Sequence, residues 1–152
     1  MARFGLGHIL NRKKTIMERR TKRRTPHSPL SILIVDDSST VVYALRKVLE
    51  QDGYHILVAG DGAEAIKATE IYQPDLILMD VVMPGMNGFQ ATRHIRKLPV
   101  AMNTPIIIIS GSEQKTEQFW LRKLGANDFI AKPILRGQLF TAIEKYLFPQ
   151  VA

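Results

Sequence analysis

The sequence has no cysteine among its 152 residues, which excludes disulfides, thiolate metal sites and thiol catalysis. No apolar run approaches the roughly 18 residues that span a bilayer. The short apolar pairs near the N-terminus never join into the apolar segment of a secretory signal, and no small-residue cleavage site follows them. A hydrophobic content of 45% and a charged content of 23% are those of a soluble globular protein. We therefore expect one folded domain of ordinary size in the cytoplasm.

The net charge of +7 is concentrated at the N-terminus. Residues 1–30 hold nine Lys or Arg against the single acid Glu18, whereas residues 31–152 hold twelve basic and thirteen acidic side chains. We interpret residues 1–29 as a basic, disordered extension that ends in a Pro-rich linker, and residues 30–149 as the folded domain.

The N-terminal extension has two further interpretations. Its apolar residues form a ragged stripe that would suit a basic helix on an anionic membrane, RNA or a partner protein. Translation starting at Met17 is the other possibility. The sequence does not separate these interpretations. The stripe consists of Leu6, Ile9, Leu10, Ile16 and Met17.

From Ser31 onward, short apolar strands alternate five times with amphipathic helices. Such βα units, joined by right-handed crossovers, predict an α/β fold: a flavodoxin-like, doubly wound (βα)5 parallel sheet in strand order 2-1-3-4-5. The predicted strands are Ile32–Val35, His55–Ala59, Asp75–Met79, Pro105–Ile109 and Asp128–Ala131. The predicted helices follow Ser38-Ser39 up to Asp52-Gly53, and then span Ala63–Tyr72, Phe89–Leu98, Ser112–Leu124 and Leu135–Leu147.

Polar residues stand at the ends of four neighbouring strands in this order. Asp36 and Asp37 end the first strand and Asp80 follows the third, while Ser110 and Lys132 follow the fourth and fifth. Each alone is equally well explained as a helix cap or loop residue. Together they predict a shared site, because three crowded carboxylates need a cation and Mg²⁺ prefers oxygen ligands. A lysine and a hydroxyl beside them suit phosphoryl oxygens, and the set suits phosphoryl transfer.

These motifs resemble those of response-regulator receiver domains over residues 31–149. The resemblance rests on Val35-Asp36-Asp37-Ser38, Asp80-x-x-Met83-Pro84-x-Met86-x-Gly88, Ser110-Gly111 and Lys132-Pro133.

The resemblance implies a role for each site residue. Asp80 would be the phosphoacceptor that takes a phosphoryl group from the phosphohistidine of a histidine kinase, so the protein would assist its own phosphorylation without being an enzyme. Asp36 and Asp37 would hold Mg²⁺ together with Asp80 and the backbone carbonyl of Val82. Ser110, which stands where many members have threonine, and Lys132 would engage the phosphoryl group.

The resemblance also implies a conformational switch and a slow reset. Phe129 would turn inward as Ser110 moves towards the phosphate, and Lys132-Pro133 would be a cis peptide bond. Val82 is apolar where some members carry an acid or amide that helps water attack, so we expect slow self-dephosphorylation.

The chain ends at Ala152, shortly after the last predicted helix, so we expect a stand-alone receiver that signals by binding. The family's contact face would be formed here by Glu113–Leu124, Phe129–Ala131 and Gln138–Tyr146. Trp120 would be either an exposed anchor on this face or part of the core.

Two segments, Phe119–Asp128 and Met83–Thr92, resemble the receivers of type IV pilus twitching-motility systems, which implies a chemotaxis-type kinase. The kinase, the target, the choice between activator and phosphate sink, and the choice between a monomer and a phosphorylation-dependent dimer all stay open.

Two other functional classes compete with this interpretation. One is an adaptor that binds nucleic acid or an anionic membrane through residues 1–29, with the receiver as its regulator. The other is a flavodoxin-like cofactor binder. It is disfavoured because Ser38-Ser39-Thr40 lacks a phosphate-cradling glycine and because Asp36-Asp37 would repel a phosphate.

Overall fold

The computed structural model describes residues 29–111, 119 and 122–149. The N-terminal extension up to residue 28, including Met17, and most of the predicted helix Ser112–Leu124, including Trp120, lie outside the described residues. The division between extension and domain therefore stays a prediction. None of the described helices is both long enough and apolar enough to cross a membrane.

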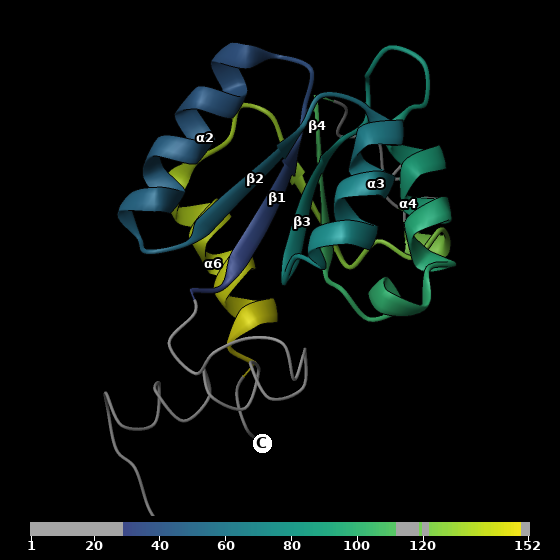
Figure 1. The fold of residues 1–152 in the computed structure, drawn as a ribbon. Helices are drawn as coiled ribbons and strands as arrows, with labels where there is room; N and C mark the ends of the chain where they lie inside the picture. The colour runs from purple at the N-terminus through teal and green to yellow at the C-terminus, as the bar shows by residue number, and fades with distance from the viewer. Residues whose placement is uncertain (1–28, 112–118, 120–121, 150–152) are drawn as a thin grey trace, which may run out of the picture.

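Five strands and five helical segments are described, and their labels are those of Figure 1. The strands are β1 (Ser31–Val35), β2 (His55–Ala59), β3 (Leu76–Asp80), β4 (Ile106–Ser110) and β5 (Asp128–Ala131). The helices are α2 (Ser39–Gln51), α3 (Gly62–Tyr72), α4 (Gly88–Arg96), the 3-10 turn η1 (Pro99–Ala101) and α6 (Arg136–Leu147).

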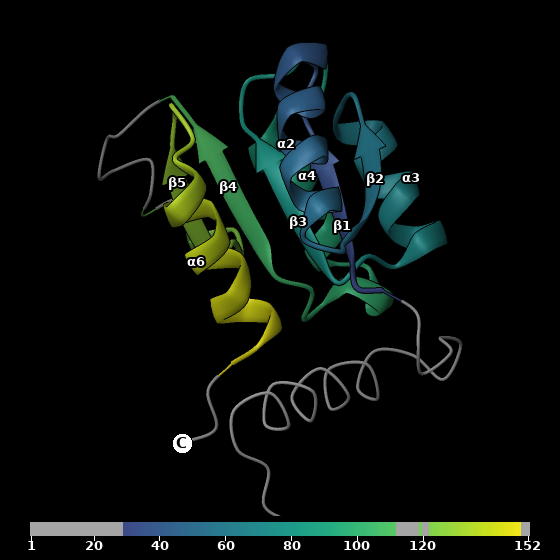
Figure 2. The same ribbon diagram turned by 90° about the vertical axis from the view of Figure 1, so that its left-hand side faces the viewer.

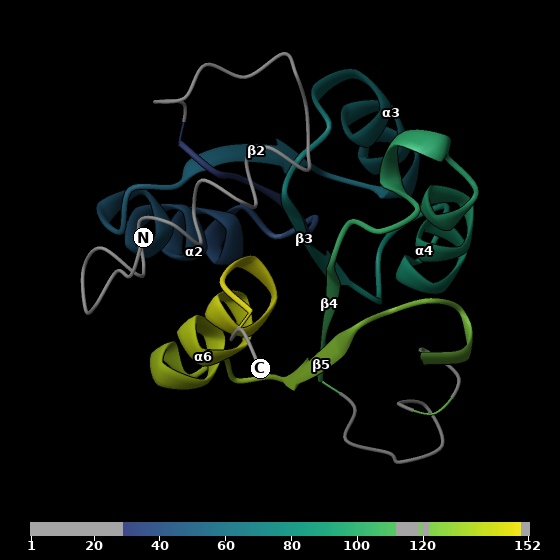
Figure 3. The ribbon, with the colours of Figure 1, turned by 90° about the horizontal axis from the view of Figure 1, so that it is seen from below.

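The strands form one parallel sheet in the order β2-β1-β3-β4-β5. Helices α2 and α6 cover one face of the sheet, and α3 and α4 cover the other (Figure 1). The view from the α2 side shows α2 and α6 in front of the strands (Figure 2), and the view from below shows the sheet between the two helical layers (Figure 3). The predicted doubly wound fold is confirmed.

Alternate residues of the central strands pack into different layers of the core. In β3, Leu76 and Leu78 belong to the layer beneath α2 and α6, whereas Ile77 and Met79 belong to the layer beneath α3 and α4. Strands β1 and β4 alternate in the same way. Because both faces of these strands are covered, their sequences are continuous apolar runs without a polar side. Each fully buried aliphatic side chain stabilises the fold by about 1.5–3 kcal/mol relative to its exposure.

Local backbone preferences place the helix ends. Ser38 caps α2 by accepting a hydrogen bond from Val41 N, and Asn87 forms a capping box with Gln90 at the start of α4. Helix α2 thus begins four residues after the end of β1, and α4 begins eight residues after the end of β3.

Several predicted element boundaries were wrong by one or two residues, among them those of the third and fourth strands. The third strand is shifted one residue towards the C-terminus and includes Asp80, which pairs in register with Ile109. The predicted helix Phe89–Leu98 ends at Arg96, because Leu98 precedes a proline and takes an extended backbone. Leu135 is likewise extended and precedes α6 rather than starting it.

Candidate functional site

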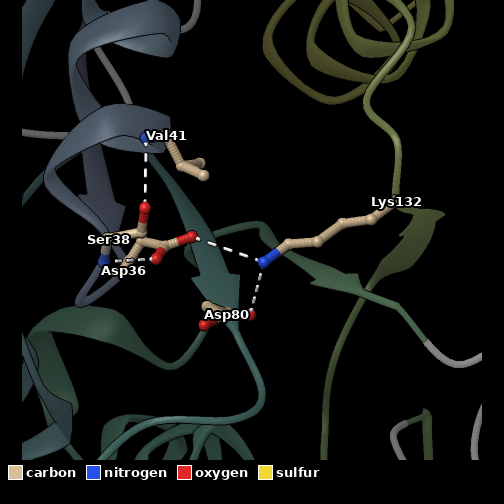
Figure 4. Close-up of polar contacts among 5 residues, drawn as sticks. All are labelled: Asp36, Ser38, Val41, Asp80 and Lys132. Carbon is tan, nitrogen blue, oxygen red and sulfur yellow. Dashed lines mark hydrogen bonds and ion pairs between the residues drawn. The ribbon is translucent and has the colours of Figure 1, made fainter.

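The carboxyl ends of β1, β3 and β5 bring acidic side chains and one ammonium group together (Figure 4). Asp36 follows β1, Asp80 is the last residue of β3, and Lys132 follows β5. Since β1, β3, β4 and β5 are successive neighbours in a parallel sheet, their carboxyl ends share one edge. The structure thus brings Asp36, Asp80 and Lys132 together at this edge, and their chemical roles stay predictions.

Asp36 is buried and held in a fixed orientation. Its backbone N–H continues the pairing with β2 by donating to the carbonyl of Ala59, at 3.1 Å. Its Oδ1 accepts a hydrogen bond from the backbone N–H of Ser38 at 2.8 Å, and its Oδ2 lies 3.7 Å from Lys132 Nζ. One oxygen of Asp36 is therefore hydrogen-bonded to the backbone, while the other faces the ammonium group of Lys132.

Asp80 is as deeply buried as Asp36, with 5% of each residue accessible. Burial and the neighbouring charge of Asp36 raise the pKa of Asp80, and the hydrogen bond and charge of Lys132 oppose this shift. The folded protein thus disfavours a negative charge on Asp80 unless a cation accompanies it.

Lys132 connects two of the acidic residues across the sheet. Its Nζ donates a hydrogen bond to Oδ1 of Asp80 at 3.2 Å and forms the longer ion pair with Asp36 (Figure 4). Its backbone N–H donates to the carbonyl of Ser110, at 2.8 Å, which extends the pairing between β4 and β5. The peptide bond between Lys132 and Pro133 is cis, as predicted.

Two residues predicted to form a switch lie on neighbouring strands. Ser110 is the buried last residue of β4 and pairs in register with Ala131. Phe129 lies within β5, is partly buried, and packs against the core layer beneath α3 and α4. The two side chains thus belong to adjoining strands that end at this edge, and their movement stays a prediction.

The carboxylates fit a hard divalent cation. Asp36, Asp37 and Asp80 each place one oxygen within 4.8 Å of the others, and Asp37 is exposed while the other two are buried. Only oxygen donors are contributed, which suits Mg²⁺ and not a soft metal. Burial and the charge of Asp36 raise the pKa of Asp80, and a bound cation would offset both effects by stabilising the ionised carboxylate.

The loop between β3 and α4 contains close contacts that the sequence pattern did not single out. Gly88 N–H donates to the carbonyl of Val81 at 2.9 Å, and a Cβ added to Gly88 would overlap the carbonyl oxygen of Asp80. Sequence reasoning identified Gly88 only as part of a motif and gave no reason to notice Gly62, on which Met86 rests. The predicted ligand residue Val82 lies in this loop with 79% of its surface exposed.

An apolar groove lies beside the acidic edge. It has a volume of about 380 Å³ and runs between α2 and the start of α6, with Lys132 in its wall. A second groove of about 350 Å³ lies between β5 and α6, lined in part by Phe129, Gln138 and Thr141. The first groove thus presents an apolar surface beside Lys132.

Comparison with known proteins identifies relatives of the whole described fold. Residues 32–144 match the model of the response regulator receiver domain. The chain is 40% identical over 116 residues to protein PilH of Pseudomonas aeruginosa, covering 76% of this chain and 96% of PilH. It is 37% identical to the CAI-1 autoinducer sensor kinase/phosphatase CqsS of Vibrio cholerae, of which it spans 17%.

Solved structures give the same result. The receiver domain of the sensor histidine kinase PA1611 from Pseudomonas aeruginosa, solved with a magnesium ion coordinated in its active-site cleft, superposes with a TM-score of 0.73 at 28% identity, over 79% of this chain and 98% of that one. The Vibrio cholerae chemotaxis protein CheY4 superposes with a TM-score of 0.75 at 26% identity, over 78% and 99%.

Proposed function

Since this chain belongs to the response regulator receiver domain family, we propose that it is a single-domain response regulator that accepts a phosphoryl group on Asp80 from a histidine kinase. The observation that supports this most is the pairing of a buried carboxylate with a lysine ammonium at 3.2 Å, on an edge that carries two further acids. The protein is a phosphoacceptor in this proposal and not an enzyme that acts on other molecules.

The reaction makes one bond and breaks one. A carboxylate oxygen of Asp80 attacks phosphorus, the bond from phosphorus to the donor imidazole nitrogen breaks, and its electron pair returns to the imidazole. Lys132, placed 3.2 Å from Asp80, compensates the charge on the phosphoryl oxygens as they approach the carboxylate. Ser110, at the end of the neighbouring strand, supplies a hydroxyl donor for the same oxygens.

Mg²⁺ would be held by Asp36, Asp37, Asp80 and the backbone carbonyl of Val82, and when bound it would neutralise charge that develops on the phosphoryl oxygens. Support comes from the mutual approach of the three carboxylates to within 4.8 Å and from the magnesium ion described for the PA1611 receiver domain.

The output would pass through β5 and α6 together with the segment that precedes β5. The groove between β5 and α6 lies beside Phe129, the proposed switch residue, and β5 itself ends at Lys132. Movement of Ser110 and Phe129 on phosphorylation would change the shape of this groove. A protein target or a second copy of the chain would then bind the groove with a different affinity.

For the pathway we propose twitching motility or chemotaxis, with a chemotaxis-type kinase as the phosphodonor. The support is the similarity to PilH over nearly its whole length and to CheY4 in fold. The adaptor alternative, in which residues 1–29 bind nucleic acid or an anionic membrane, depends on residues outside the described part of the chain.

Intact-protein mass after incubation with acetyl phosphate tests the proposed chemistry. We expect a single phosphoryl adduct on the wild type with Mg²⁺, and none after addition of a chelator or in Asp80→Ala. Asp52→Ala, which removes an exposed acid at the far end of α2, serves as the matched control and should be labelled normally. An adduct that persists in Asp80→Ala, or that needs no metal, would exclude Asp80 as the acceptor in a Mg²⁺-dependent reaction.

A further inference from the structure

The loop from Val81 to Asn87 connects the proposed acceptor strand to α4 and contains Val82, whose carbonyl is the proposed fourth metal ligand. Its two ends are fixed. Val81 is buried and accepts the hydrogen bond from Gly88, and Asn87 caps α4. The position of the loop between these ends depends on what it rests against.

Met86, the residue before the capping Asn87, rests on the first residue of α3. A Cβ built on Gly62 would lie 2.9 Å from Cβ, Cγ and the carbonyl oxygen of Met86. Two of these atoms belong to the backbone or are bonded directly to it, so rotation of the Met86 side chain could not relieve the contact. The backbone of Gly62 does not adopt a positive φ. Glycine is therefore required at this position for space and not for conformational freedom.

The start of α3 is a firm support. The Asp61 side chain accepts a hydrogen bond from the backbone N–H of Glu64 at 2.8 Å, and Glu64 Oε2 accepts one from the backbone N–H of Gly60 at 2.7 Å. Ala65, on the inner side of the same turn, is buried in the core layer beneath α3 and α4. A group added to Gly62 would consequently displace the loop and not the helix.

We infer that Gly62 is a positioning residue for the metal site: its missing side chain lets Met86 seat against α3 and so fixes the loop that carries the Val82 carbonyl beside Asp80. This inference rests on the proposed function, because it concerns the same Mg²⁺ site. A methyl group at position 62 would push the loop outward and move one of the four ligands, while the three carboxylates on their strand ends keep their places.

The first test is the Mg²⁺ dissociation constant, measured by calorimetric titration. Loss of a group that orients a metal ligand typically weakens metal binding by about 10–100-fold, and we expect Gly62→Ala to weaken it by roughly tenfold or more. Gly137→Ala is the matched control, because it makes the same substitution in the first turn of α6 where nothing lies within 4 Å of the added atom. It should leave the dissociation constant unchanged.

The second test identifies Met86 as the intermediary. Met86→Gly removes two of the three atoms that the added methyl group would meet. The effect of Gly62→Ala on Mg²⁺ affinity should therefore be at least about threefold smaller in the Met86→Gly background than in the wild type, which is a coupling expected only of residues in contact. If Gly62→Ala alone does not fold, the double variant is the test: a folded double variant that binds Mg²⁺ supports the contact with Met86, and one that also fails to fold overturns it.

The outcomes separate this inference from the proposed function. A wild type that binds no Mg²⁺, or binds it equally well after Asp80→Ala, would overturn the proposed function and the inference with it. Wild-type binding that depends on Asp80 but is unaffected by Gly62→Ala would overturn the inference alone. Equal losses in the presence and absence of the Met86 side chain would also overturn it, because the effect would not pass through the loop.

Discussion

Lys132 Nζ donates a hydrogen bond to Oδ1 of Asp80 at 3.2 Å, although the two residues are 52 positions apart in the sequence. The pair forms because β3, β4 and β5 are successive strands of one parallel sheet and end at the same edge. A half-buried ammonium beside a buried carboxylate makes the pKa of Asp80 depend on Lys132. This dependence can be measured directly.

Replacing Lys132 with Met should raise the pKa of Asp80 further. The lysine opposes the upward shift that burial and Asp36 produce, and its removal leaves those two causes unopposed. The measurement is a carbon NMR titration of the Asp80 carboxyl group in the presence of a chelator. Lys47→Met, which removes an exposed cation from α2, is the control and should leave the titration unchanged. A lower pKa in Lys132→Met would contradict the assignment of the ion pair.

Asp80→Asn should stabilise the metal-free protein at neutral pH. A carboxyl group whose pKa is raised on folding costs nothing below its ordinary pKa of 3.8, where both states are protonated. The destabilisation grows as the pH rises from there and is complete above the raised pKa. The stability difference between Asp80→Asn and the wild type should therefore be present at pH 7 and shrink as the pH falls through the raised pKa. Urea unfolding with a chelator at several pH values measures this difference in the free energy of unfolding. A difference that grows towards low pH would contradict the prediction.

Gly88→Ala should destabilise the fold by about 1–3 kcal/mol, the usual cost of overpacking. The added Cβ would overlap the carbonyl oxygen of Asp80 and lie 2.9 Å from Cα of Val81, and both are backbone atoms that cannot rotate away. Gly137→Ala is the matched control and should be neutral or stabilising by up to roughly 1 kcal/mol. Urea unfolding followed by circular dichroism compares the free energies of unfolding of the two variants. Equal values would show that the loop accommodates the added methyl group without loss of stability.

Val82→Asn should shorten the lifetime of the phosphorylated protein. Val82 is 79% exposed beside Asp80 and offers no hydrogen bond to an attacking water, whereas an amide would. Decay of the adduct mass after removal of acetyl phosphate measures the rate. Val100→Asn, at an exposed position in η1, is the control and should decay like the wild type. A wild-type half-life of seconds that lengthens in Val82→Asn would refute slow self-dephosphorylation.

The fold and the edge of the site followed from local patterns. Three runs of four apolar residues without polar alternation, in β1, β3 and β4, require strands covered on both faces, and the intervening helices enforce parallel pairing. Once the order 2-1-3-4-5 is accepted, the residues after β1, β3, β4 and β5 must meet, which is why Asp36, Asp80 and Lys132 were predicted together. One small error, the helix that ends at Arg96 instead of Leu98, arose because a proline changes the preceding backbone.

The contacts inside the site did not follow from such patterns. Which oxygen of Asp36 accepts from Ser38, and how closely Met86 approaches Gly62, depend on how segments distant in sequence or turns of irregular backbone pack against each other. No periodicity or composition indicates that a Cβ at position 62 would lie only 2.9 Å from Met86. The chemical roles of the site residues stay predictions that the experiments above address.

The sequence by itself determined the parallel α/β architecture and the identity of the groups at its carboxyl edge, because apolar periodicity and strand order are properties of the chain. Only the tertiary structure decided which of these groups are buried, that Lys132 reaches both Asp36 and Asp80, and that the loop after β3 rests on a glycine of α3. The physical reason is that burial, charge coupling and steric contact depend on distances through space, and close packing sets those distances after the strands have been placed.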